Sequence, residues 1–369
     1  MSKSLETVHD VDGPWSLATS RRFWEGFAPS ALAAQDEDAS IHAEFLSDTD
    51  WQRVDVVISQ VDGMARVVVT GEGDLDAATA QVLRFMSLDI DGRGWPAVAD
   101  LDPVIADAQR RLPGFRPCGF FSPYEAAAWA VLSQRISMRQ AATIKSRLTN
   151  EHGDDGAFPA PAVLRELDLN LPGRKTEYLH AVAEAALDGA LSGSRLRTLP
   201  ADEALGQVQE IKGLGPFAAE LVVIRGANFP DVLPKNEERL SDEIVQQYGA
   251  DASVASITEA WRPYRSWAAV HLRALREERT HEIERGRRER CARALGQPSG
   301  TVPEDDTPRW QRNTAPARRV ILRKCDLTGG DDDTYRAGST RTSNGAKAGS
   351  AASAGITDTS AGTGPWLIT

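Results

Sequence analysis

A Gly-Leu-Gly turn at residues 213–215, between two apolar helical segments, constrains the fold of this chain more than any other feature. Gly213 and Gly215 allow a tight turn, because glycine adopts backbone angles that other residues avoid. They also leave backbone N–H groups bare at the start of the next helix, where helices bind anions. We therefore expect a hairpin of two helices at about residues 204–226, in which Gly213, Leu214 and Gly215 hold a phosphate oxygen. The alternative is a tight turn between helices without a ligand.

A loop bounded by prolines follows this hairpin and ends in two carboxylates, Glu237 and Glu238. The string GLGPFAAELVVIRG, together with DVLP and these carboxylates, resembles the bacterial 3-methyladenine DNA glycosylase II family of the helix-hairpin-helix DNA glycosylase superfamily. The strings SPYEAAAWAVLSQRIS, WRPYRSWAAVHL and GPWSLATSRRFWEGFAP resemble the same family. The resemblance covers about residues 13–285, and it implies that the hairpin amides hold a DNA phosphate.

The resemblance implies an α+β fold, in which residues 1–112 form an antiparallel β-sheet domain with helices. Residues 113–290 then form a two-lobed, all-α glycosylase domain that contains the helix-hairpin-helix. The residues themselves predict strands at Val54–Ile58 and Ala65–Thr70, joined through an Asp-Gly turn. They also predict a helix at Asp74–Leu88, where leucine, valine and methionine recur at helical spacing.

The resemblance assigns the catalytic role to Glu237. The family's catalytic aspartate falls six residues after the Asp of DV-x-P, which is Asp231 here, and this position holds Glu237. A carboxylate there would stabilise positive charge on the sugar as the N-glycosidic bond breaks. Glutamate is one methylene longer, and a displacement of about 1 Å can cost about a hundredfold in rate. The alternative is a solvated helix start formed by Glu237 and Glu238.

The resemblance also assigns a wedge and a base pocket. Gln134 and Arg135 fall where the family inserts a side chain into the duplex to fill the space left by a flipped base. The alternative is that this pair ends a surface turn. Phe217, Leu221 and Arg273 fall at base-pocket positions, where aromatic faces would attract a cationic alkylated purine. Arg273 would repel such a base, so we expect a shift towards neutral lesions or a shallow pocket.

Three further residues, all in the string WRPYRSWAAVHL, are expected to support the site. Trp261 and Trp267 read as packing residues, because large aromatic side chains are mostly buried. Arg265 either buttresses the cleft or reaches a phosphate. In lyase-competent members of the superfamily a lysine stands where this chain has Phe217, so a covalent amine mechanism is not expected.

The net charge of −11 argues at first sight against a nucleic-acid partner. The acidity is concentrated in the first hundred or so residues, which need not touch DNA, and no strongly basic stripe is present. We therefore expect a modest DNA affinity that depends strongly on salt. Residues 291–369 include a Gly/Ser/Thr/Ala tract with few large apolar residues, and we expect a disordered, low-complexity tail.

The same patterns bear on cofactors, partners and location. The three cysteines are far apart and odd in number, so they form neither a disulfide framework nor a metal cluster. No apolar window of about 18 residues exists, and the first residues lack the apolar segment of a signal peptide. We expect a cytoplasmic monomer without membrane contact, cofactor or catalytic metal, and with a structural monovalent or divalent ion at the hairpin at most. No protein partner is specified.

The interpretation is a monofunctional DNA N-glycosylase that removes alkylated or related damaged purines from double-stranded DNA and leaves an abasic site. The alternative is a non-catalytic DNA-damage binding protein on the same fold, which has lost the catalytic aspartate. A third possibility is an enzyme for a different base, suggested by Arg273.

Overall fold

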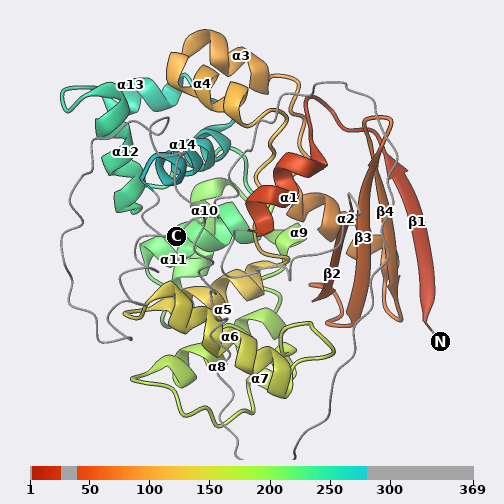
Figure 1. The fold of residues 1–369 in the computed structure, drawn as a ribbon. Helices are drawn as coiled ribbons and strands as arrows, with labels where there is room; N and C mark the ends of the chain where they lie inside the picture. Colours follow the sequence, from red (N-terminus) through yellow and green to blue (C-terminus); the bar gives the residue numbers. More distant parts are fainter. Residues whose placement is uncertain (1, 26–39, 281–369) are drawn as a thin grey trace, which may run out of the picture. The chain divides into compact units, whose positions relative to one another are not determined.

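The computed structural model describes residues 2–25 and 40–280 (Figure 1). One antiparallel sheet forms near the N-terminus, and the chain is helical almost throughout after it, so the expected α+β fold is confirmed. The expected disordered tail at residues 291–369 lies outside the described residues, as do the last ten residues of the expected glycosylase domain.

The sheet has four strands in the order β1-β4-β3-β2, and every neighbouring pair is antiparallel. Both predicted strands are confirmed, because they lie within β3 and β4, and the turn between them has positive φ at Asp62 and Gly63 (51° and 84°). Such a two-residue turn matches the twist of the strands that it joins. The strands are β1 (Lys3–His9), β2 (Ile41–Leu46), β3 (Arg53–Val61) and β4 (Met64–Gly71).

Apolar residues alternate along β3 and β4, so that one face of the sheet is buried. Helix α2 (Leu75–Phe85) packs against β4 and β1. The predicted helix at Asp74–Leu88 is confirmed: Asp74 caps its start by accepting a hydrogen bond from the backbone N–H of Ala77. The aromatic side chains of Phe45, Phe85 and Phe121 stack or tilt against one another in this core.

Helix α5 (Pro123–Ser133) is buried along almost its whole length, and it packs against α6, α8, α11 and η2. A helix that is apolar on all sides belongs in the interior, so α5 is central to the helical part of the chain. One continuous apolar cluster joins α5 to the buried face of the sheet. The other elements are α1 (Leu17–Glu25), α6 (Met138–His152), α7 (Pro161–Leu164), α8 (Lys175–Leu187), α9 (Gly193–Leu196), α10 (Ala201–Gln209), α11 (Pro216–Leu221) and the π-helical turn η2 (Val222–Gly226).

A second apolar cluster forms between α3 (Trp95–Leu101), α4 (Pro103–Arg111), α12 (Glu238–Tyr248) and α14 (Arg265–Thr280). Trp261 and Trp267 are buried in it, so their expected packing role is confirmed. Helix α13 (Val254–Glu259) precedes Trp261 along the chain.

Asp102 ties this second cluster together. Its Oδ2 accepts hydrogen bonds from Nε1 of Trp261 and from the Tyr248 hydroxyl, both at 2.7 Å, while its Oδ1 caps α4. Helices α3 and α4 therefore pack with helices from the far end of the described chain, although they precede residue 112. The boundary at residue 112 stays a prediction.

Candidate functional site

The predicted hairpin lies between α10 and α11, and its two glycines have different environments. Gly213 has a φ of +95°, and a Cβ atom added to it would lie 2.3 Å from Cγ of Tyr178, so this position needs glycine for the protein's own packing. Gly215 has an extended backbone (φ −91°, ψ −175°), and a Cβ atom there would meet open space. Leu214 is buried between them. Gly215 thus leaves an open approach to the backbone at the start of α11.

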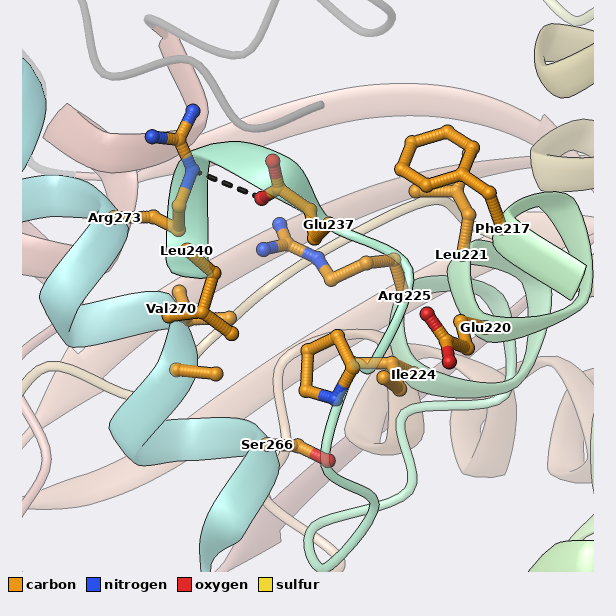
Figure 2. A pocket seen from close by; sticks show the side chains of 12 residues that line it. Phe217, Glu220, Leu221, Ile224, Arg225, Glu237, Leu240, Ser266, Val270 and Arg273 are labelled. Atoms are coloured by element: carbon orange, nitrogen blue, oxygen red, sulfur yellow. Dashed lines mark ion pairs between the residues drawn. The ribbon is translucent and has the colours of Figure 1, made fainter. Parts of the chain in front are cut away.

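A pocket lies next to the hairpin, with walls from α11, η2, α12 and α14 (Figure 2). It brings together the residues expected to bind the base, Phe217, Leu221 and Arg273, with the expected catalytic residue, Glu237. Phe217 is 39% exposed, whereas the other three are buried. The cavity measures about 40 Å³, which is space for a few water molecules. The pocket therefore brings the expected base-binding and catalytic residues together around a small cavity.

Glu237 and Arg273 form a buried ion pair in this pocket, with Nε of Arg273 2.9 Å from Oε2 of Glu237 (Figure 2). Glu237 is 9% exposed, so it is not part of a solvated helix start, whereas Glu238 is exposed. Removing one partner of a buried pair leaves an uncompensated charge and typically costs about 3–5 kcal/mol. The pair therefore holds the carboxylate of Glu237 in place beside Arg273.

The ion pair with Glu237 alters the expected effect of Arg273 on a bound base. A lone guanidinium would repel a cationic base, but here its charge is compensated by Glu237. The electrostatic potential at any point in the pocket then depends on whether the guanidinium of Arg273 or the carboxylate of Glu237 is nearer. The preference for neutral bases stays a prediction.

The loop at residues 231–237, which carries Glu237, is held by hydrogen bonds near both of its ends. At its start, Asp231 accepts hydrogen bonds from Arg265 (Nε to Oδ1, 2.7 Å) and Arg262 (Nη1 to Oδ2, 2.9 Å). Near its end, the buried carboxylate of Glu220 accepts hydrogen bonds from the backbone N–H groups of Lys235 and Asn236. In this structure Arg265 thus buttresses the loop.

The expected wedge residues lie in the turn between α5 and α6. Nε2 of Gln134 donates to the carbonyl of Gly213 (2.9 Å), so this turn is joined directly to the hairpin. Arg135 is exposed and has a φ of +57°, a left-handed conformation that is uncommon for a residue other than glycine. The ammonium group of Lys175 donates to the carbonyls of Val131 and Leu132 at the end of α5. Gln134 is therefore held within the protein, and Arg135 is the side chain that faces outward.

Two charged residues of the pocket wall were missed in the sequence. Glu220 and Arg225 stand within the apolar run AAELVVIRG, and a charged residue at a buried helical position is the signal that identifies them. Arg225 is buried, donates a hydrogen bond to the carbonyl of Cys118, and lies over the ring of Phe23 at 5.3 Å. Burial lowers the pKa of Arg225 to about 10, so it remains charged at neutral pH.

Within residues 2–25 and 40–280 no group of three or more His, Cys, Asp or Glu side chains is arranged to hold a metal ion. None of the described helices is long and apolar enough to cross a membrane.

Comparison with known proteins finds similar DNA glycosylases. No protein-family model matches the chain. It is 29% identical to DNA-3-methyladenine glycosylase 2 of Escherichia coli, over 58% of this chain and 80% of that protein. It is 30% identical to a probable bifunctional transcriptional activator/DNA repair enzyme AlkA of Mycobacterium tuberculosis, over 54% of this chain and 42% of that protein. The chain is therefore similar to proteins of the bacterial 3-methyladenine DNA glycosylase II family.

The comparison with solved structures concerns the fold alone. A 3-methyladenine DNA-glycosylase from Archaeoglobus fulgidus matches 75% of this chain and 99% of its own, with a TM-score of 0.59 and 18% identity, which shows a shared fold. The match to the Mycobacterium tuberculosis protein spans about two fifths of that protein's length. The roles of individual residues in this chain remain predictions.

Proposed function

We propose that this protein is a monofunctional DNA N-glycosylase of base-excision repair. It would hydrolyse the bond between an alkylated purine and its deoxyribose in double-stranded DNA. The observation that carries the proposal is the place of Glu237, a buried carboxylate in the wall of a pocket next to the hairpin. The name of the Escherichia coli relative, a DNA-3-methyladenine glycosylase, supports it.

DNA binding would use three parts of the described structure. The backbone at Gly215, which a Cβ atom would not crowd, would hold a phosphate near the damaged nucleotide. The base would rotate out of the duplex into the pocket behind Phe217, and Arg135 would fill the space that it leaves. Because Gln134 bonds to the hairpin carbonyl at Gly213, the phosphate site and the wedge would act at a fixed separation.

Bond cleavage would depend on the charge of Glu237. As the N-glycosidic bond breaks, its electron pair leaves with the purine, and positive charge develops on the sugar, which the carboxylate stabilises. Water then adds to the sugar carbon and loses its proton to solvent, which gives the abasic site. An alkylated purine is already cationic and leaves as a neutral base, so little general-acid help is needed. With Phe217 in place of a lysine, no Schiff base forms.

The ion pair has two opposing effects on this reaction. Arg273 fixes the direction of the Glu237 carboxylate, which preorganises the site. The same guanidinium opposes positive charge on the sugar. In our proposal Oε2 stays with Arg273, and Oε1 is the oxygen that faces the sugar.

Cleavage of a cationic base needs no Lewis acid, so we propose a reaction without cofactor or catalytic metal, and an ion at the hairpin would be structural. We also propose that the protein acts as a monomer on double-stranded DNA in the cytoplasm.

Release of free base under single-turnover conditions tests the proposal, with duplexes that carry 3-methyladenine, 7-methylguanine or hypoxanthine. We expect release by the wild type, a loss of about a hundredfold or more in Glu237→Ala, and equal or faster release in Glu237→Asp. A wild type that binds the lesion duplex without releasing base, and a Glu237→Asp variant that releases it, would establish the non-catalytic damage binder instead. Absence of both release and damage-specific binding would refute the glycosylase.

A further inference from the structure

Glu220 is a buried carboxylate in the pocket wall that the proposed reaction does not use. It lies in α11, is 6% exposed, and lines the same pocket as Glu237 (Figure 2). A buried carboxylate is costly unless it is paired or hydrogen-bonded, so its partners show why it is tolerated there.

All the hydrogen bonds that the described structure gives to this carboxylate come from one short loop. Oε1 accepts the backbone N–H of Lys235 (2.9 Å) and the side-chain amide of Asn236 (2.7 Å), and Oε2 accepts the backbone N–H of Asn236 (3.0 Å). Three donors on two oxygens suit a carboxylate, because both of its oxygens can accept hydrogen bonds. A glutamine at position 220 would instead turn its side-chain NH₂ group towards one of these N–H groups, and a donor would then face a donor.

Glu220 anchors Lys235 and Asn236, and Asn236 immediately precedes Glu237 in the chain. Glu237 occupies the N-cap position of α12, yet its side chain makes no capping hydrogen bond and pairs with Arg273 instead. The backbone of the loop is therefore fixed by Glu220, and the direction of the Glu237 side chain is fixed by Arg273. Both constraints are needed to place one carboxylate.

We propose that Glu220 is a positioning residue, which fixes the loop at Lys235 and Asn236 and so aims the carboxylate of Glu237 at the sugar. This inference rests on the proposed function of Glu237. A displacement of about 1 Å can cost about a hundredfold in rate, so an anchor one residue away has a large effect. Because Glu220 belongs to the helix that begins at the hairpin, the phosphate site and the carboxylate are set by a single rigid element.

Single-turnover base release from an alkylated duplex tests this role in Glu220→Gln, which keeps the shape and removes one acceptor oxygen. We expect the rate to fall by about 10- to 100-fold, while the Kd for the duplex changes less than about twofold. Glu203→Gln is the matched control, because Glu203 is an exposed glutamate on α10, and its rate should equal that of the wild type.

A double-variant cycle distinguishes a positioning role of Glu220, which acts through Glu237, from a role of Glu220 that is independent of Glu237. In a Glu237→Gln background, Glu220→Gln should cause no further loss of the residual rate, because its effect passes through Glu237. Losses that multiply would overturn the proposal, and so would a Glu220→Gln rate within twofold of wild type.

Amide hydrogen exchange tests the anchor without any measurement of activity. The amides of Lys235 and Asn236 should exchange at least about tenfold faster in Glu220→Gln, while those of Val67 and Val69 in β4 stay unchanged. Equal exchange at Lys235 and Asn236 in both proteins would show that no anchor exists. Faster exchange in a protein whose wild type releases no base would leave the anchor in place and reject the glycosylase function alone.

Discussion

Arg273 holds the carboxylate of Glu237 at 2.9 Å, in a pocket where neither side chain is more than 10% exposed. We expect Arg273→Met to lower the free energy of unfolding by about 3 kcal/mol, because the substitution leaves a buried carboxylate without its partner. The double variant Arg273→Met with Glu237→Gln should recover most of this loss, since both charges are then absent. Urea unfolding measures both values.

Arg139→Met is the matched control for this experiment, because Arg139 is exposed on α6. Its free energy of unfolding should stay within about 0.5 kcal/mol of the wild type. If Arg273→Met were equally mild, the ion pair would not contribute to the fold in solution.

His271 is a buried titratable side chain on α14, so the stability of the protein should depend on pH. It is buried between the rings of Trp95 and Phe115, with ring centroids 4.9 and 5.0 Å away, and burial lowers its pKa to about 4. Below pH 6.5 the unfolded chain therefore binds a proton that the folded chain does not, and stability falls as the pH drops from about 6.5 to about 4. At pH 5 this residue should remove about 2 kcal/mol of the stability present at pH 7.

Urea unfolding of wild type and His271→Leu at pH 7 and pH 5 isolates this effect, because other titrating groups are common to both proteins. The loss between the two pH values should be larger in the wild type. Equal losses would show that His271 is not held neutral in the folded protein.

In the hairpin, we expect substitution of Gly213 to affect folding and substitution of Gly215 to affect DNA binding. Gly213→Ala should destabilise the protein by about 2 kcal/mol or more, because φ is positive and the new Cβ atom would lie 2.3 Å from the Tyr178 ring. Gly215→Ala should leave the stability within about 1 kcal/mol, because its backbone is extended and the space is open. Its methyl group would instead crowd the proposed phosphate, so we expect the duplex Kd to rise about tenfold.

Thermal unfolding and duplex binding by fluorescence anisotropy, measured on the same two variants, check this contrast. A Gly215→Ala variant with wild-type affinity would mean that no phosphate approaches this backbone.

The elements of this region follow from local sequence, whereas the contacts between them do not. The turn between the two apolar helices is set by residues close together in the sequence, and so are the two strands that an Asp-Gly turn joins. The structure contains the helical turn and the pair of strands. The pairing of Glu237 with Arg273, 2.9 Å apart in space, joins a loop to α14, and no local pattern specifies which cation a carboxylate will meet. The anchor at Glu220 is similar, because its three donors lie beyond the end of its own helix. Folding supplies these contacts, and they are what define the site.

At the scale of the whole chain, charge limits how DNA can be bound. The net charge is −11, so long-range attraction to a polyanion is weak, and affinity must come from a few close contacts. Near the hairpin, Lys212 and Arg174 already share the carboxylate of Glu177. The exposed Arg135 and the hairpin backbone then provide most of the contacts that we propose.

We therefore expect few phosphates to be neutralised, about three or four, and the logarithm of the binding constant to fall with the logarithm of salt concentration with a slope of about −3 to −4. Anisotropy titrations of a lesion duplex between about 50 and 200 mM salt measure this slope, and an undamaged duplex of the same length is the control. Both duplexes should give similar slopes, because phosphate contacts carry no information about the base, while the lesion duplex binds more tightly at every salt concentration. A slope steeper than about −7 would require about twice as many phosphate contacts, and the hairpin and wedge turn alone would not account for DNA binding.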